Sequence, residues 1–148
     1  MNSVMRLHMR APADRIFAIA ADVERWPALL PHYRYVRAVG RDGEREFAMG
    51  ARRGLLPVRW QATQRPLPAQ RVIEFTHTGG VTRGMQVAWR LLPEDNGTEV
   101  RIEHSLDLGW PLIGRFAADR VIGPHFIEPI AARTLARVKQ LVEMETDR

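Results

Sequence analysis

Apolar and polar side chains alternate along residues 99–108, EVRIEHSLDL, with the two-residue period of a β-strand. The apolar face of this predicted strand carries Val100, Ile102, Leu106 and Leu108. His104 shares their register, so its imidazole is expected to point the same way as the hydrophobes. It is then either a hydrogen-bonded core residue or part of a surface that binds a ligand.

Similar alternation predicts strands in six other segments. They are residues 3–10, 33–39, 44–53, 56–64, 70–78 and 85–92. Short connections rich in glycine and proline separate the later strands, among them Gly40–Gly43, Pro66–Pro68 and Pro93–Gly97. Connections of this length favour hairpins, so the simplest topology is an antiparallel meander.

Helical spacing replaces this alternation between the first two strands. Pro12 suits the first turn of a helix. The apolar residues that follow at helical intervals are Ile16, Phe17, Ala20 and Val23. Residues 26–32, WPALLPH, predict a second short helix or turn, which Pro31 closes because proline disfavours helical geometry in the residue before it.

The C-terminal third also predicts helices. Residues 112–123 indicate one helix, interrupted at Gly123-Pro124. One face of a long final helix is traced by Ile127, Ile130, Ala131, Thr134, Val138, Leu141 and Val142. This helix is the main candidate to cover the apolar face of the sheet. A helix about 10 to 12 Å across cannot fill the concavity of so large a sheet, so a cavity between sheet and helix is expected.

The fold class predicted by this order is α+β, in a single domain of residues 1–148. The chain has a formal net charge of +5, and Lys139 is the only lysine among its 22 basic residues. The arginines are scattered among acidic residues, whereas a nucleic-acid-binding surface is normally clustered. Nucleic-acid binding is therefore not expected.

Several other classes of site are not predicted. The chain lacks the run of roughly 20 apolar residues that a spanning helix needs, and its start lacks a secretory signal, so we expect a cytoplasmic protein. Without cysteine it can form no disulfide or thiolate site. No HExxH, phosphate-loop or dinucleotide motif occurs, so no metal and no cofactor are expected. Nothing in the pattern predicts an oligomeric state.

Candidate ligand-binding residues follow from the predicted inward register of each strand. They are Phe47, Met49, Trp60, Phe75, Met85, Trp89 and Ile102. Trp60 and Trp89 have flat rings suited to stacking on a planar ligand, although ordinary core packing explains large inward aromatics as well. Tyr33 and Tyr35 share one register of their strand, and the pattern leaves open which register faces inward. Tyr35 is taken as the candidate cavity tyrosine.

The candidate catalytic residues are His77 and His104. Neutral imidazole can donate from one nitrogen and accept at the other, and its ordinary pKa near 6.5 suits acid/base work in aldol-type ring closure and dehydration. The alternative for each histidine is a structural role in the core, with its ring nitrogens hydrogen-bonded to a neighbouring polar group. Ser105 follows His104 directly and therefore points to the opposite face, so the two cannot form a nucleophile-base pair.

Two turns are candidates for the mouth of the cavity. Leu55 and Leu56 lie beside Arg52 and Arg53 at a predicted hairpin tip. The pattern leaves three roles open for this tip: a ligand portal, a transient contact with an anionic membrane surface, or a tip that folds back onto the helix. The glycine-rich turn at residues 78–84 is a candidate gate for the same mouth.

Four segments carry a resemblance to a known family. They are residues 11–36 (APADRIFAIAADVERWPALLPHYRYV), 60–75 (WQATQRPLPAQRVIEF), 85–104 (MQVAWRLLPEDNGTEVRIEH) and 133–143 (RTLARVKQLVE). Together with the element order, they resemble the helix-grip fold of the START and pollen-allergen superfamily, in its polyketide cyclase/dehydrase and aromatase-like branch. The resemblance implies a curved antiparallel sheet of six to seven strands wrapped around a long C-terminal helix, with two short helices after the first strand.

The resemblance also implies functions. The first is binding of a small, apolar, aromatic or polycyclic ligand between sheet and helix, with cyclase, aromatase or dehydratase chemistry in which His77 or His104 shuttles protons. The same pattern is similar to the coenzyme Q-binding proteins, which implies a non-catalytic carrier of a quinone or lipid. It is also similar to the ribosome-associating toxins related to them, which implies a ribosome-directed interaction protein.

Overall fold

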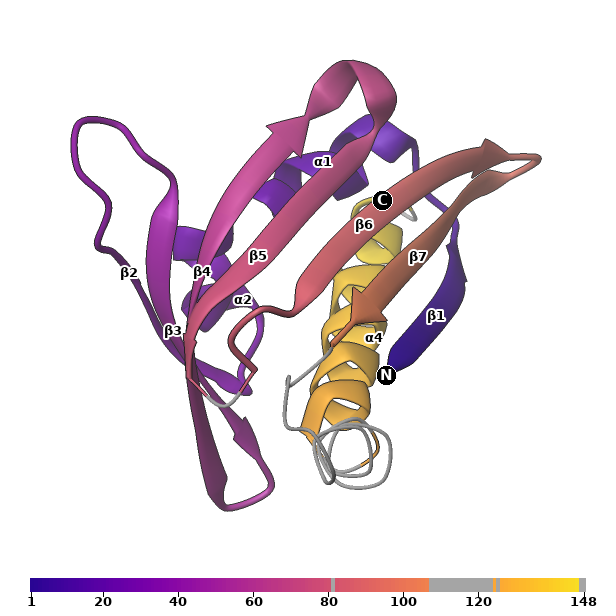
Figure 1. Cartoon of the computed structure of the whole chain (residues 1–148). Coiled ribbons are helices and arrows are strands. Elements are labelled where there is room, and N and C mark those ends of the chain that lie inside the picture. The colour runs from indigo at the N-terminus through magenta and orange to yellow at the C-terminus, as the bar shows by residue number, and fades with distance from the viewer. Residues whose placement is uncertain (81, 107–123, 125, 147–148) are drawn as a thin grey trace.

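The described residues form seven antiparallel strands in one sheet that curves around the C-terminal helix (Figure 1). The computed structural model describes residues 1–80, 82–106, 124 and 126–146. The strands are β1 (Asn2–Met9), β2 (Tyr33–Ala38), β3 (Glu46–Arg53), β4 (Leu56–Leu67), β5 (Val72–Gly80), β6 (Gln86–Glu94) and β7 (Gly97–Ser105). The helices are α1 (Ala13–Ala21), α2 (Trp26–Leu29) and α4 (Glu128–Thr146), with single 3-10 turns η1 (Val23–Arg25) and η2 (Pro68–Gln70).

The sheet order is β1-β7-β6-β5-β4-β3-β2. Consecutive strands from β2 to β7 are therefore neighbours, as the predicted meander requires, and β1 closes the sheet by pairing with β7. The two short helices lie between β1 and β2, and α4 lies against the concave face (Figure 1). The predicted α+β helix-grip architecture is confirmed. The helix expected over residues 112–123, and Leu108 of the last strand, lie outside the described residues.

The two-residue period places the strand side chains as the sequence predicts. On β7, Val100, Ile102 and His104 are buried, whereas Ser105 is exposed. On α4 the buried residues are Ile130, Ala131, Thr134, Leu135, Val138 and Val142. These two surfaces face each other, so burial of their apolar area is the main force that holds the helix to the sheet.

Strand β4 is longer than the sequence predicts. It continues through Pro66 to Leu67, where a turn was expected at Pro66–Pro68. β3 pairs with β4 as far as Thr63, and the Gln64 amide still donates to the Arg45 carbonyl at 2.7 Å. Beyond Gln64, β4 pairs on one side alone among the described residues. Proline lacks an N–H, and this locally unpaired edge is where a strand tolerates it.

A β-bulge in β2 decides which tyrosine faces the core. Tyr33 pairs with Ala51 and Tyr35 pairs with Gly50, so the register shifts between them. Tyr33 is consequently buried, and Tyr35 lies on the outer face with the Arg37 guanidinium 4.7 Å from its ring centroid. The expectation that Tyr35 faces the cavity is wrong, because one extra residue reverses the side chains that follow.

Gly50 lies beneath the Tyr35 ring, and a Cβ atom at position 50 would overlap that ring. We expect Gly50→Ala to lower the free energy of unfolding by about 1 to 3 kcal/mol, because the ring has to move away from the strand. Urea denaturation measures the change. In a Tyr35→Ala background the same substitution is expected to have little effect, and an equal loss in both backgrounds would contradict the proposed overlap.

Candidate functional site

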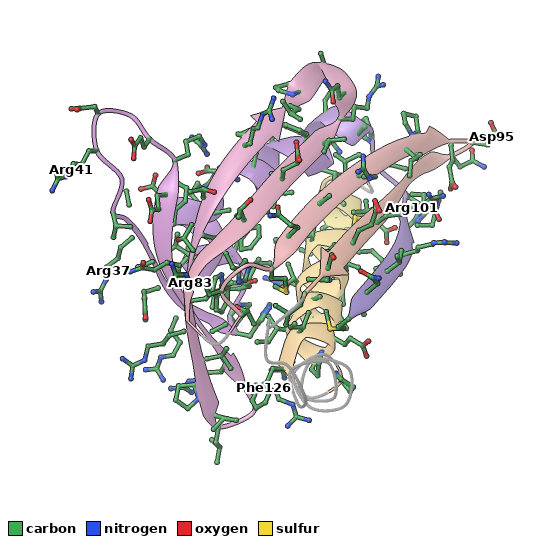
Figure 2. All side chains as sticks on the ribbon, in the orientation of Figure 1. Arg37, Arg41, Arg83, Asp95, Arg101 and Phe126 are labelled. Atoms are coloured by element: carbon green, nitrogen blue, oxygen red, sulfur yellow. The ribbon has the colours of Figure 1, made fainter. Side chains whose placement is uncertain are left out.

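A cavity of about 90 Å³ lies between the concave face of the sheet and α4. Its described lining comes from α2, from strands β2 to β7, from the β5–β6 turn and from the start of α4. Figure 2 places Phe126, one of the lining residues, beside the first turn of α4 at one end of the molecule. The lining is mostly aromatic and aliphatic, so the site suits a flat apolar ligand.

Trp26 organises the aromatic part of this lining. Its ring centroid lies 5.0 Å from that of Tyr33 in an edge-on arrangement, 5.9 Å from Trp89 and 6.3 Å from Phe75. The indole Nε1 donates a hydrogen bond to the Ile19 carbonyl of α1 at 3.0 Å, which holds the ring of Trp26 in one orientation. Four aromatic side chains from four elements therefore form one continuous wall.

His77 stacks on Trp60 within the cavity. The two rings are almost parallel, with an interplanar angle of 2° and centroids 5.8 Å apart. Nδ1 of His77 lies 2.6 Å from the Thr82 hydroxyl, which the β5–β6 turn supplies. Backbone hydrogen bonds of His77 with Gly84 and Met85 hold that turn against the strand. Val81, within the same turn, lies outside the described residues.

His104 differs from His77 in its hydrogen bonding. It lies on β7 opposite Val87 of β6 and Ser3 of β1, and its side chain is buried. Among the described residues, no donor or acceptor lies within hydrogen-bonding distance of its Nδ1. A buried polar atom without a partner is uncommon, and it is a position where a ligand group can supply the missing hydrogen bond.

Both imidazoles are neutral at pH 7. Burial lowers the pKa of His104 to about 4. Burial, and secondarily the charge that His104 would carry, lower the pKa of His77 to about 3. Neutral imidazole can accept a proton, and the imidazolium formed in this setting is a stronger acid than an ordinary imidazolium, so it readily gives the proton back.

These low pKa values predict that the protein loses stability as the pH falls. In the unfolded chain each histidine binds a proton near pH 6.5, whereas in the folded protein His77 and His104 stay neutral down to about pH 3 and 4. The free energy of unfolding should therefore fall between pH 6.5 and 4, by about 1 kcal/mol per pH unit for each histidine. Urea denaturation at pH 7, 6 and 5 measures the slope. The double variant H77Q/H104Q should have a shallower slope, and an unchanged slope would contradict the assignment.

A second polar group borders the cavity on α4. The Thr134 hydroxyl donates to the Ile130 carbonyl at 2.8 Å and therefore accepts from Nε2 of His32 at 2.9 Å. Burial raises the pKa of Tyr33 to about 12, an effect that a hydrogen bond with Thr134 partly offsets. The Tyr33 phenol thus keeps its proton at neutral pH and can serve as a hydrogen-bond donor.

Most of the residues predicted for the site line the cavity. They are Met49, Trp60, Phe75, His77, Met85, Trp89, Ile102 and His104. Phe47 is buried in the core and is not among the described lining residues, and Tyr35 lies on the outer face.

Sequence reasoning missed several lining residues. They are Trp26, Tyr33, Val58, Thr82, Val87, Phe126, Ile127, Ile130, Ala131 and Thr134. Val58 and Val87 share the strand registers of Trp60 and Trp89, and the residues at the start of α4 were expected on one face of the helix, so the period was an available signal for them. Trp26 and Thr82 lie in a one-turn helix and a turn, where no period points to the cavity.

Two findings concern other kinds of site. Within the described part of the chain, no group of three or more His, Cys, Asp or Glu side chains is placed to hold a metal ion. None of the described helices has both the length and the apolar character needed to cross a membrane.

Comparison with known proteins identifies the family. A family model described as polyketide cyclase / dehydrase and lipid transport matches residues 9–121, more than half of the chain. The chain belongs to this family. The matched range contains every strand-borne residue of the cavity and ends before α4. The granaticin polyketide synthase bifunctional cyclase/dehydratase of Streptomyces violaceoruber is 30% identical over 98 residues, which cover 64% of this chain. The match spans only 30% of that protein's length.

Solved structures show the same fold in other proteins. The Zhui aromatase/cyclase from Streptomyces sp. R1128 superimposes with a TM-score of 0.78 at 19% identity, over 99% of this chain and 95% of that one. BexL, a di-domain aromatase/cyclase of the BE-7585A biosynthetic pathway, gives a TM-score of 0.76 at 24% identity, over 100% of this chain and 48% of that one. The arrangement of sheet, short helices and C-terminal helix is therefore common to all three.

Proposed function

We propose that this protein binds a planar aromatic or polycyclic ligand derived from a polyketide and catalyses its dehydration or aromatisation. The observation that carries the proposal is the unpartnered Nδ1 of His104, buried in a cavity whose walls are aromatic. Family membership supports the reaction class, because the family includes polyketide cyclases and dehydrases beside lipid-transport proteins.

The proposed reaction is loss of water from a β-hydroxy ketone ring. Nδ1 of neutral His104 removes the proton from the carbon between the ketone and the hydroxyl-bearing carbon, and the electron pair moves to the carbonyl oxygen. As the carbonyl re-forms, the C–OH bond breaks and the departing hydroxide takes the proton from the imidazolium. Water leaves, a carbon–carbon double bond remains, and His104 is neutral again.

Other cavity residues are proposed to orient the ring. The aromatic wall around Trp26 would hold a flat ligand by stacking. The Tyr33 phenol would give up its hydrogen bond with Thr134 and donate to the ketone oxygen as negative charge develops on it. His77, held by Thr82 and stacked on Trp60, would add a second polar contact. Because the lining is apolar, bulk water would be largely excluded, which strengthens these hydrogen bonds.

The test uses 4-hydroxy-2-tetralone, a bicyclic β-hydroxy ketone that yields fluorescent 2-naphthol when it loses water. We expect the protein to accelerate this step at least about 100-fold over buffer, the range of a positioned acid/base group. A reaction at the protein surface is controlled for by adding 2-naphthol at the start, which should compete with the substrate for the cavity and slow the reaction. If the protein binds 2-naphthol but 2-naphthol forms no faster than in buffer, the catalytic part of the proposal is contradicted.

A further inference from the structure

A second hollow lies next to the cavity, where the β3–β4 hairpin approaches the start of α4. It has a volume of about 160 Å³ and is lined by Arg52, Arg53, Gly54, Pro129, Ile130 and Arg133. Figure 1 shows the hairpin projecting at the same end of the molecule as the first turn of α4. Half of the described lining residues are arginines, and they come from two separate elements, so we name this hollow the basic pocket.

The positive charge of the basic pocket is not neutralised by its described surroundings. In residues 1–80, 82–106 and 126–144, no carboxylate forms an ion pair with Arg52, Arg53 or Arg133. The sequence has no acidic residue between Glu46 and Glu74, so every residue of the hairpin after Glu46 is basic or neutral. Uncompensated arginines gathered around a hollow favour an anion.

Glu128 is the acidic residue at the start of α4, and it is engaged elsewhere. Its Oε1 accepts a hydrogen bond from the Ser3 hydroxyl of β1 at 3.3 Å. β1 and β3 are separated by four strands in the sheet order. The first two turns of α4 therefore present Arg133 to the hairpin and Glu128 to the opposite side of the sheet.

The basic pocket and the cavity share a wall. Ile130 lines both, and the next turn of the same helix places Thr134 in the cavity. The Arg52 amide donates to the His32 carbonyl at 2.8 Å, and the His32 ring in turn bonds to Thr134. Burial lowers the pKa of His32 to about 4, and the positive charge of Arg133 is the second cause of this lowering. The two spaces are therefore adjacent, with Ile130 between them.

We propose that the basic pocket binds an anionic group, a phosphate or a carboxylate, on the same ligand whose aromatic part occupies the cavity. Guanidinium groups pair with both anions through two parallel N–H···O hydrogen bonds, so arginines contributed by the hairpin and by α4 can together accommodate the charge of a phosphate. The inference rests on the proposed function for the aromatic half of the ligand and adds the charge that the ligand carries.

The test compares 2-naphthol, 2-naphthoate and 2-naphthyl phosphate as ligands, with tryptophan fluorescence as the readout because Trp26, Trp60 and Trp89 line the cavity. We expect the phosphate to bind about tenfold more tightly than 2-naphthol, and the carboxylate to fall between them, since each exposed ion pair adds only a small factor. In R52Q/R53Q/R133Q the three affinities should agree to within about twofold.

The matched control is R6Q/R41Q/R65Q, which removes the same charge from exposed positions outside the basic pocket. Arg41 lies at the far end of the sheet from the hairpin tip (Figure 2). This variant should keep the preference for the phosphate. Loss of the preference in the control as well would show a general charge effect and overturn the proposal.

Other outcomes separate this inference from the proposed function. If 2-naphthol binds and the phosphate binds no better, the basic pocket does not hold a ligand anion, while the cavity still binds aromatics. If none of the three binds, the ligand site itself fails and the inference fails with it. If R52Q/R53Q/R133Q keeps the preference but no longer sediments with phosphatidylglycerol vesicles, the arginines contact a lipid surface beside Leu55 and the proposal is wrong.

Discussion

Replacement of His104 by glutamine is expected to lower kcat for dehydration at least about 100-fold, while the Kd for 2-naphthol changes less than about threefold. Glutamine keeps polar atoms in the cavity but cannot accept and return a proton at neutral pH. The aromatic wall that holds the ligand is untouched by the substitution. Single-turnover formation of 2-naphthol from 4-hydroxy-2-tetralone measures the chemical step, and fluorescence titration measures the affinity.

Ser105→Ala is the matched control, because Ser105 is the next residue on β7 and its side chain is exposed on the outer face. It should leave both constants unchanged. The wild-type rate should also persist down to about pH 5, because the pKa of His104 is lowered to about 4 and the base stays neutral there. An H104Q protein that is folded and as active as the wild type would exclude His104 as the base.

Replacement of Trp89 by alanine is expected to lower the free energy of unfolding by about 3 to 5 kcal/mol. Trp89 is only 3% exposed, and it lies on β6 between two neighbouring strands and against Trp26. Removal of the indole leaves a space that the surrounding sheet can close only in part. Equilibrium urea denaturation at pH 7.5, with the H104Q protein as a second reference, measures the loss.

Leu92→Ala provides the comparison on the same strand, since Leu92 is exposed on β6. It should change stability by less than about 1 kcal/mol. A loss from Trp89→Ala no larger than that of Leu92→Ala would mean that the cavity wall is loosely packed. Stacking on a rigid aromatic surface would then no longer explain how the ligand is held.

The part of the site that lies on strands could be predicted from the sequence, because it depends on the local alternation of side chains along each strand. The side-chain period of a strand assigns His77, His104 and Trp89 to one face, and burial on that face agrees. Tyr35 was assigned wrongly for the same reason. The period holds only while the register holds, and the bulge between Tyr33 and Tyr35 reverses it.

The remaining part of the site depends on contacts between distant residues. Trp26 enters the cavity because α2 packs under the sheet, and Thr134 meets His32 across 102 positions of the chain. No local pattern reports such pairs. The basic pocket is likewise assembled from a hairpin and a helix that are far apart in sequence.

By itself the sequence determined the α+β class, the meander, the inward face of each regular strand and the presence of two histidines among hydrophobes. Those features follow from the periods of hydrophobic burial, which each segment carries on its own. Only the tertiary structure decided which tyrosine enters the cavity, which nitrogen of His104 lacks a partner and which arginines meet beside α4. These features depend on how one element packs against another, and the free energy of that packing cannot be inferred from the sequence of a single segment.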